Sequence, residues 1–384
     1  LARISGAWIS RGNGQEHLTA LRSPVLTGVG ACGAFLMMQD NVPLRASGFC
    51  NVNELFDANS EQAARIEVIK GPASVLYGSN AMHGMINIIS PLVEPVHRIG
   101  LEFGAHDYVR LKASLGNDAW RLDANGTRDG GYKDESGFGQ HKLTLAHHRD
   151  AGDWDITARL SVTNLNQETA GFIEGPSAYK LDALRKSNPN PEAYRDTQAA
   201  HLNASLARTL ANGTRILITP YARYTEMDFI QHFLPGQALE QNRHASLGFE
   251  SAYYLPDWTL GIDVERTDGY LRETQPGPTV GSAFLAATIP QGDHYDFAVV
   301  AVTYAAFAEY RAQPMADLDL SVGVRLESVT YDYDNRMITG RTKADGTPCL
   351  FGGCRFNRPA DRRDTFTNLS PKLGLTYNWS DESQ

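Results

Sequence analysis

The sequence predicts a mainly β chain with a small N-terminal domain that is followed by an all-β, antiparallel barrel of the membrane type. From about Pro91 onward, segments of about ten residues alternate apolar and polar side chains, as barrel strands do. The connections between these segments alternate between short and long. A soluble β-sandwich would also show the alternation, but it gives no reason for the regular change in connection length. The pattern therefore favours a barrel with short turns at one end and long loops at the other.

Length and composition narrow the class of protein. A chain of 384 residues is expected to hold two domains. Its net charge of -9 argues against a nucleic-acid partner. The longest apolar runs, 25–38 and 297–308, fall short of the ~20 residues of a membrane helix. Because the chain begins at Leu1 without a signal peptide, we expect it to be truncated at its N-terminus.

Residues 65–91 form the most informative stretch of the N-terminal part. Alternating apolar residues such as Ile66 and Val68 predict one strand, and Met85 to Ile89 predict a buried second strand. The segment between them is rich in glycine and proline, which supply turn conformations. The stretch is therefore expected to be a compact unit of two strands around a turn-rich middle.

This stretch resembles a known motif. It reads R-I-E-V-I-K-G-P-A-S-V-L-Y-G-S-N-A-M-H-G-M-I-N-I-I-S-P, and it is similar to the end of the plug domain of TonB-dependent outer-membrane receptors, R-I-E-V-x-R-G-P-x-S-x-L-Y-G-x-x-A-x-x-G-x-I-N-I-I. Lys70 in place of arginine and His83 in place of a small residue are mild departures. The motif positions expected to be structural are Lys70, Gly71, Pro72, Tyr77, Gly78, Gly84 and Asn87. Residues 36–44 resemble an earlier plug segment, with Asn41 in place of a turn glycine.

The resemblance implies a domain division. Residues 1–91 would be an N-terminally incomplete α+β plug domain, and 92–384 the first part of a large antiparallel barrel of the 22-strand type. The barrel is truncated here to about twelve strands and is C-terminally incomplete. The expected strands lie near 98–105, 108–116, 119–127, 140–148, 154–164, 199–209, 214–224, 245–254, 258–268, 298–311, 316–328 and 367–379. A short surface helix is expected near 179–186.

The four cysteines fall into two local pairs, Cys32 with Cys50 and Cys349 with Cys354. Three connectivities are possible, and local pairing in an oxidising compartment is favoured because it closes the shortest loops. Four buried free thiols are the alternative. A zinc site is disfavoured by the spacing and by the lack of a histidine cluster, so no metal site is expected.

The resemblance also implies roles for plug residues. Arg22 and Arg65 match the plug arginines that pair with glutamates on the barrel wall in this family, partners expected beyond Gln384. For Arg65 the alternative is a solvated ion pair with Glu67. These three residues form the predicted plug–barrel coupling set.

Substrate contact is expected from an apical plug loop and from long barrel loops. In the plug loop 43–49 the candidates are Arg45 and Phe49, and in the aromatic loop 229–236 they are His232 and Phe233. The second loop could equally pack over the barrel mouth. The loop between Cys349 and Cys354 is a further candidate.

The implied function is uptake of a scarce nutrient across the Gram-negative outer membrane, driven by TonB and its inner-membrane energising complex. A ferric siderophore or other iron complex is the most common substrate class, and haem, cobalamin and oligosaccharides are the alternatives. Outer-membrane lipid is the other expected partner, and no cofactor is expected. Catalysis is disfavoured because the sequence has no hydrolase elbow, phosphate loop or histidine–carboxylate metal motif. An outer-membrane barrel enzyme or an adhesin remains the alternative from another class.

Overall fold

The computed structural model describes residues 4–12, 14–24, 35–49 and 56–379. Cys32 and Cys50, predicted to pair, lie outside the described residues. Among the helices that the model describes, none is long and apolar enough to cross a bilayer.

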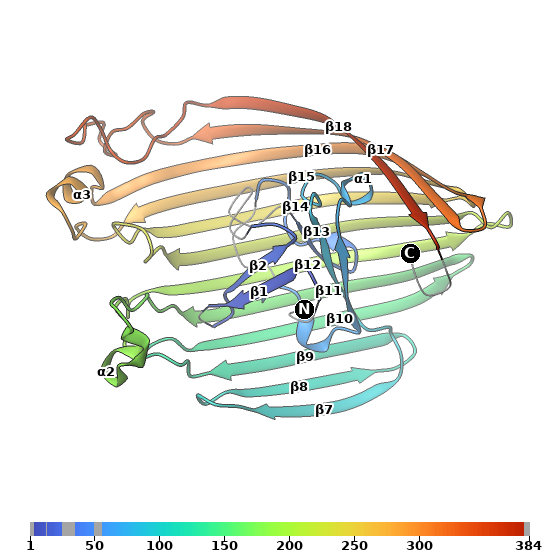
Figure 1. Cartoon of the computed structure of the whole chain (residues 1–384), viewed down its shortest axis with the longest axis horizontal. Coiled ribbons are helices and arrows are strands. Elements are labelled where there is room, and N and C mark those ends of the chain that lie inside the picture. The colour runs from blue at the N-terminus through green and yellow to red at the C-terminus, as the bar shows by residue number, and fades with distance from the viewer. Residues whose placement is uncertain (1–3, 13, 25–34, 50–55, 380–384) are drawn as a thin grey trace.

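Twelve strands form one continuous sheet in which every strand pairs with its neighbours in sequence. The sheet curves into part of a barrel wall (Figure 1). All pairings are antiparallel, and the order runs from β18 back to β7 without a crossover. The strands are β7 (Val96–Phe103), β8 (Val109–Gly116), β9 (Trp120–Asp129), β10 (Phe138–Ala151), β11 (Trp154–Glu168), β12 (Tyr194–Thr209), β13 (Arg215–Ile230), β14 (Leu239–Tyr254), β15 (Trp258–Gln275), β16 (Gly292–Met315), β17 (Leu318–Asn335) and β18 (Arg362–Tyr377).

Each strand expected from the sequence is present, and most are longer than predicted. β13 continues to Ile230 and β15 to Gln275, well beyond the predicted ends at 224 and 268. In the extra residues of β13 the charged Glu226 and Asp228 lie on the outer face, and the apolar Met227 and Phe229 are buried on the inner face. The apolar outer face therefore ends although the pairing continues. Strand ends on this side therefore could not be read from hydrophobicity.

The alternation of the strands follows their two faces. On β11, Leu160 and Val162 are exposed on the outer face, whereas Ser161 and Thr163 are buried on the inner face. On β17 the same holds for the outward Leu326 and the inward Arg325. The outer face is thus apolar and the inner face polar, as membrane barrels require.

The connections confirm the predicted change in length. Short turns at 117–119, 152–153, 210–214, 255–257 and 316–317 lie at one end of the sheet, called here the short-turn end. The loops at 104–108, 130–137, 169–193, 231–238, 276–291 and 336–361 lie at the other, called the long-loop end. These loops carry η4 (Ala178–Lys180) and α2 (Asp182–Arg185), near the predicted surface helix, and α3 (Ala283–Thr288).

The N-terminal part forms a small plug domain on the concave side of the large sheet (Figure 1). Its four-stranded sheet has the order β4 (Val42–Pro43), β3 (Leu36–Gln39), β6 (Gly84–Ile89), β5 (Arg65–Lys70), and β1 (Ala7–Arg11) pairs separately with β2 (His17–Leu21). Strand β3 runs parallel to β6, and β5 antiparallel to it. Leu21, Phe35, Met37, Ile86 and Ile88 are among the side chains of its core.

The stretch 65–91 forms the predicted pair of strands, β5 and β6. Its turn-rich middle contains a short helix, α1 (Ser74–Tyr77), that the turn residues did not indicate. Gly84 shows why glycine is needed there, because it has φ of 137° and a Cβ would collide with the carbonyl oxygen of Ile69. Asn41 adopts the left-handed conformation that its place in the motif predicts, with φ of 69°.

Candidate functional site

A cavity of about 420 Å³ lies between the plug and the sheet, toward the long-loop end. We call it the long-loop cavity. Six aromatic residues from the plug and from three neighbouring strands line it: Phe49, Phe56, Tyr270, Phe297, Tyr331 and Tyr333. The Phe297 and Tyr333 rings lie 5.1 Å apart between centres and tilt against each other. Such a wall suits a planar or aromatic ligand, because rings offer large apolar faces with a defined geometry.

The same cavity contains a few polar groups with defined roles. Arg45 is buried, pairs with the fully buried Asp57 and donates to the carbonyl oxygen of Leu44 at 3.0 Å. Among the described residues, these contacts use only part of its five-donor guanidinium group. His244 is also buried, and its Nδ1 has no hydrogen-bond partner among the described residues. An aromatic wall with a few convergent polar groups is the usual form of a small-molecule site.

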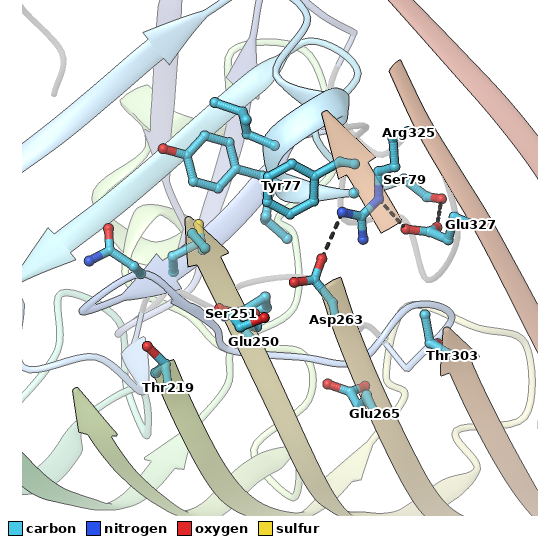
Figure 2. A pocket seen from close by; sticks show the side chains of 18 of the residues that line it. Tyr77, Ser79, Thr219, Glu250, Ser251, Asp263, Glu265, Thr303, Arg325 and Glu327 are labelled. Carbon is cyan, nitrogen blue, oxygen red and sulfur yellow. Dashed lines mark hydrogen bonds and ion pairs between the residues drawn. The ribbon is translucent and has the colours of Figure 1, made fainter. Parts of the chain in front are cut away.

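A second cavity of about 470 Å³ lies toward the short-turn end, and we call it the short-turn cavity. Figure 2 shows Tyr77 and Ser79 of the plug facing carboxylates on the barrel wall, among them Glu250, Asp263 and Glu327. Arg325 bridges two of these carboxylates, with 2.7 Å to Asp263 and 2.8 Å to Glu327. Ser79 donates a hydrogen bond to Glu327, so plug and wall are joined here by one polar contact.

The plug loop 43–49 separates the two cavities. Tyr331 donates from its hydroxyl to the carbonyl oxygen of Ser47 at 3.0 Å, and Arg223 donates to that of Pro43. Leu44 is buried, and Arg45 lines both cavities. The loop therefore closes the passage along this part of the wall, and it does so with backbone groups held by barrel side chains.

The plug is fastened to the opposite flank of the sheet by residues 56–62, which we call the anchor segment. Lys142 on β10 donates to the carbonyl oxygen of Ala58 at 2.8 Å and pairs with Glu61 at 3.0 Å. Gln140 and Thr163 donate to the carbonyl oxygens of Phe56 and Asp57, at 3.1 and 2.7 Å. Burial would raise the pKa of the Glu61 carboxyl, but the Lys142 ammonium and the Arg110 guanidinium outweigh it and hold that pKa below its usual range.

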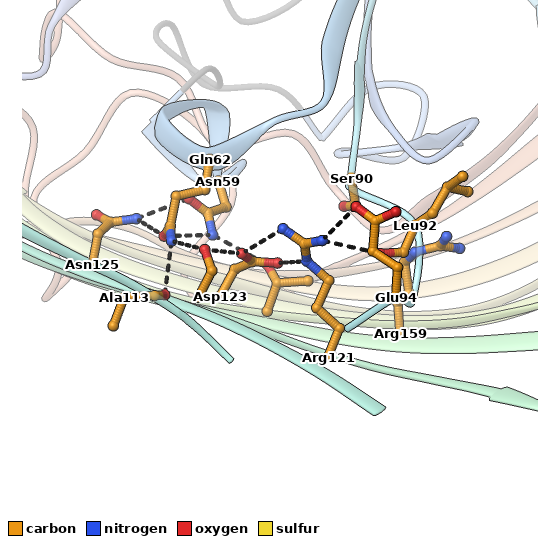
Figure 3. A network of polar contacts seen from close by, with 12 residues as sticks. Asn59, Gln62, Ser90, Leu92, Glu94, Ala113, Arg121, Asp123, Asn125 and Arg159 are labelled. Atoms are coloured by element: carbon orange, nitrogen blue, oxygen red, sulfur yellow. Dashed lines mark hydrogen bonds and ion pairs between the residues drawn. The ribbon is translucent and has the colours of Figure 1, made fainter. Parts of the chain in front are cut away.

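Amide side chains extend this attachment (Figure 3). Asn125 donates to the side-chain oxygens of Asn59 and Gln62, at 2.8 and 3.0 Å, and Gln62 donates to the carbonyl oxygen of Ala113 at 2.9 Å. Farther along, Arg121 pairs with Asp123 at 2.7 Å and donates to the carbonyl oxygen of Leu92 at 3.2 Å. The segment that leads from the plug into β7 is therefore fixed to the same flank as the anchor segment.

The structure brings together two of the four predicted substrate contacts. Arg45 and Phe49 both line the long-loop cavity, and the Phe49 ring packs over Gly269, where a Cβ would collide with it. His232 and Phe233 lie in the loop 231–238 outside this cavity, with ring centres 5.7 Å apart and Phe233 56% exposed. Contact of any of the four with a substrate stays a prediction.

The predicted coupling residues lie on the plug surface. Arg65 forms the solvated ion pair with Glu67 that the sequence offered as its alternative, at 2.7 Å and with both side chains exposed. Arg22 is exposed, has φ of 50° and forms no ion pair with the acidic residues that the structure describes. The barrel glutamates expected as their partners were placed beyond Gln384, so that pairing stays a prediction.

The plug-motif residues occupy turns and contacts of the plug. Gly71 and Gly78 have φ of 113° and 87°, and Gly78 follows α1 directly. Asn87 is fully buried and donates to the side-chain oxygen of Asn41 at 2.9 Å, which ties β6 to the turn between β3 and β4. Lys70 and Pro72 flank the turn at Gly71, and Tyr77 lines the short-turn cavity. The predicted disulfide between Cys349 and Cys354 is present in the loop 336–361.

Several residues of the site were missed by the sequence analysis. The wall aromatics Phe297, Tyr331 and Tyr333 look in sequence like ordinary strand residues, and the anchor segment carries no recognised motif. Lys142 could have been found. It precedes the apolar Leu143 in a predicted strand, and because neighbouring residues of a barrel strand face opposite sides, the lysine must point into the lumen. Among the described residues, no three histidine, cysteine or acidic side chains are grouped to hold a metal ion.

Two family models match the chain. Residues 1–85 match the TonB-dependent receptor plug domain, and 97–384 match the TonB-dependent receptor-like β-barrel. Three solved structures illustrate the similarity of fold. A ferric citrate transporter, FecA, has a TM-score of 0.74 at 13% identity, covering 99% of this chain and 57% of its own. The copper transporter OprC has 0.69 at 16% identity, covering 98% and 56%.

The third is the ferric yersiniabactin uptake receptor FyuA from Yersinia pestis, with a TM-score of 0.67 at 15% identity, covering 99% of this chain and 59% of that one. The chain thus spans a little over half the length of the proteins that it resembles.

Proposed function

The chain belongs to the family of TonB-dependent receptors, and from that premise we propose that it is part of a receptor that imports an iron chelate with aromatic groups. The family lies in the outer membrane of Gram-negative bacteria. Its members and structural neighbours are receptors and transporters rather than enzymes. The proposal concerns the nutrient and the partners of this receptor.

The observation that carries the proposal is the aromatic wall of the long-loop cavity. Six aromatic residues of the plug and the barrel line a space of about 420 Å³, within the usual range for small-molecule sites. Aromatic iron chelators such as catecholates and phenolates present flat rings that stack on such walls. The guanidinium group of Arg45, which lines this cavity, can meet the negative charge of the chelating oxygens.

Energy for import would come from TonB and its inner-membrane complex. The plug closes the passage in two places, at the loop 43–49 and at the anchor segment, through many buried polar contacts. Each of these contacts that breaks inside the barrel leaves a buried polar group without its partner, at about 1–3 kcal/mol apiece. An external pull on the plug is therefore part of the proposed transport step.

Haem is a second candidate, and one observation favours it. The buried His244 lines the long-loop cavity, and its Nδ1 atom has no hydrogen-bond partner among the described residues. A histidine nitrogen is a common axial ligand of haem iron. Loss of the His244 ring should therefore weaken the binding of haem more than the binding of an aromatic ferric chelate.

Binding to the purified full-length receptor tests the proposal. We expect a ferric catecholate to quench tyrosine and tryptophan fluorescence with saturation, and a ferric hydroxamate without rings to bind at least about tenfold more weakly. Tyr331→Ala or Phe297→Ala should weaken catecholate binding by about tenfold or more, since loss of a well-packed ring costs over about 1.4 kcal/mol. Phe103→Ala, on the exposed face of β7 and outside the cavity, is the matched control and should change binding by less than about twofold.

Other results would redirect the proposal. Equal affinity for both ferric chelates would contradict the aromatic class. Tight haem binding that is lost in His244→Ala would favour haem. Uptake of the bound chelate by whole cells should stop when TonB is deleted, and continued uptake would exclude TonB as the partner.

A further inference from the structure

One acidic side chain on the wall of the long-loop cavity is held without a cation. Of the two acidic residues that line the cavity among the described residues, Asp364 forms a bidentate ion pair with Arg362, at 2.6 and 2.7 Å. The other is Glu240 near the start of β14, which is only 9% exposed. Within the described part of the chain, the Glu240 oxygens accept hydrogen bonds only from neutral amides. The protonation state of this carboxyl therefore decides whether the cavity wall repels a negatively charged ligand.

The two amide partners of Glu240 can serve both of its protonation states. Nδ2 of Asn242 donates to Oε1 of Glu240 at 2.7 Å, and Nε2 of Gln231 donates to Oε2. The amide oxygen of Gln231 is buried and has no donor among the described residues. A half-turn of this amide would bring its oxygen to Glu240, where it can accept a hydrogen bond from a protonated carboxyl. Glu240 can therefore take up a proton and keep both of its hydrogen bonds.

A second carboxylate lies beside Glu240. Glu273 is directly opposite it across the β14–β15 pair. The ring nitrogens of His294 face two acceptors, Oε1 of Glu273 at 3.0 Å and the carbonyl oxygen of Pro290 at 2.8 Å, so both nitrogens donate and the ring is a cation. Two neighbouring carboxylates favour a proton on one of them. Because His294 stabilises the charge of Glu273, Glu240 is the one that takes up the proton.

The nearest cation on the other side of Glu240 is already paired. Phe229 of β13 lies opposite Glu240, and the guanidinium carbon of Arg195 is 4.7 Å from the centre of the Phe229 ring. Arg195 forms an ion pair with Glu16 of the plug at 3.4 Å. The other charged or titratable residues of the neighbouring loop and the cavity wall are His232, Arg45, Arg243, His244, Arg362 and Asp364.

Glu240 lies beyond the apolar band of the barrel. The outward residues of β15 are apolar up to Val264 and charged from Arg266 onward. Glu273, which lies level with Glu240, is roughly 20 Å farther along the membrane normal than Val264. Burial raises the pKa of the Glu240 carboxyl above its usual range; Asn242 opposes this shift, and the charge of Glu273 adds to it. The carboxyl therefore changes its charge closer to neutral pH than an ordinary glutamate does.

We propose that Glu240 is a specificity-determining residue that admits anionic cargo more readily when its carboxyl is neutral. This inference rests on the proposed function, in which the chelating oxygens of the cargo carry negative charge. The Glu240 carboxylate repels such a cargo inside the cavity at higher pH. As the pH falls through the pKa of Glu240, the repulsion disappears and the affinity for the cargo rises. By linkage, binding of the cargo then takes up a proton.

The pH dependence of binding to the purified full-length receptor tests this role. The probe is a hexadentate ferric tris-catecholate, and its affinity is measured by fluorescence quenching from about pH 8 to about pH 5. Glu240→Gln keeps the shape of the side chain but cannot ionise. At pH 8 we expect this variant to bind the probe at least about fivefold more tightly than the unchanged receptor, because one repelling charge is gone. The two affinities should converge at pH 5, and titration of the probe itself cancels in this comparison.

Asp228→Asn is the matched control. Asp228 lies on β13 next to the level of Glu240, but it faces outward, because its neighbour Phe229 is buried on the inner face. This variant should reproduce both the affinity and the pH dependence of the unchanged receptor.

A gain of affinity at pH 8 cannot arise from a damaged site, so the Glu240→Gln variant separates a charge effect from a structural one. Equal or weaker binding by Glu240→Gln at pH 8, or an equal gain in Asp228→Asn, would overturn the inference and leave the proposed function in place. If the unchanged receptor binds no catecholate at any pH in this range, the proposed function falls, and the inference falls with it.

Discussion

Lys142 brings a charged group into a place where water does not reach. Only 1% of its side chain is exposed, and its ammonium group is held by Glu61 and by the carbonyl oxygen of Ala58. A buried ammonium is costly unless it is paired and fully hydrogen-bonded. A small displacement of the anchor segment would leave the buried ammonium group of Lys142 without its partner. The segment is therefore expected to be either fully docked or fully released.

Replacement of Glu61 tests this dependence. Glu61→Gln removes the charge partner and should destabilise the docked plug by about 3–5 kcal/mol, the usual cost of leaving one buried charge unpaired. The measurement is the midpoint of guanidinium-induced plug unfolding in the detergent-solubilised full-length receptor. The double variant Glu61→Gln with Lys142→Met should recover part of the loss.

Glu94→Gln is the control for this experiment. Glu94 also pairs with an arginine, Arg121 at 3.4 Å, but its side chain is largely exposed. Exposed pairs contribute about 0–1 kcal/mol, so this variant should shift the midpoint little. Equal effects of the two substitutions would contradict the role given to burial.

At the scale of elements, the loop 336–361 is organised around one buried side chain. Arg358 is fully buried and donates to the carbonyl oxygens of Ile338, His294 and Lys343, at 2.6, 3.1 and 3.2 Å. The disulfide between Cys349 and Cys354 closes the tip of the same loop. The loop also has two isolated β-bridges, Gly340 with Arg358 and Thr342 with Pro348. The guanidinium group and the disulfide add to these bridges in fixing its shape.

Arg358→Gln should loosen this loop without changing the barrel. Its carbonyl partners would lose their donors, and trypsin should then cut at Arg341 or Lys343 at least about tenfold faster, because cleavage follows the population of the open loop. Arg363→Gln, an exposed residue on β18, is the control and should leave the cleavage rate unchanged. Unchanged cleavage in Arg358→Gln would show that the disulfide and packing alone hold the loop.

The strands of the barrel could be predicted because each has an apolar outer face and a polar inner face. Apolar and polar residues therefore alternate along the sequence with a period of two. The apolar outer face ends where β13 and β15 leave the bilayer, and at the end of β13 the apolar residues Met227 and Phe229 point inward instead, so the ends of both strands were missed. In the site, Arg45 and Phe49 were found through the plug motif. The rings of Tyr331 and Tyr333 were not found. They line the cavity only because β17 faces the plug loop 43–49, which lies almost 300 residues earlier in the sequence. The anchor segment was missed because hydrogen bonds to backbone carbonyls leave no residue pattern in the segment that accepts them.

At the scale of the whole molecule, the described sheet has two edges. Strands β7 and β18 each pair with one neighbour only among the described residues. An open edge has unpaired backbone groups, which a lipid environment does not tolerate. The wall seen here therefore needs further strands to become a stable membrane barrel.

Expression of residues 1–384 alone tests that requirement. We expect this fragment to aggregate and to show no heat-modifiable migration in gels, whereas the full-length receptor should migrate differently before and after boiling. Outer-membrane insertion and heat-modifiable migration of the fragment would mean that it closes its edges by itself, for example by pairing with a second copy.

Arg45 has one more consequence, because the same guanidinium group borders the space above the plug loop and the space below it. A ligand that draws this side chain upward and a force that withdraws its partner Asp57 act on a single equilibrium. Thermodynamic linkage then requires the two effects to be equal in size and in sign: whatever factor the ligand adds to the ease of releasing the plug, release must add to the affinity for the ligand. Breaking this ion pair would therefore hold the cargo more tightly, and its discharge has to come from the loss of other contacts in the cavity.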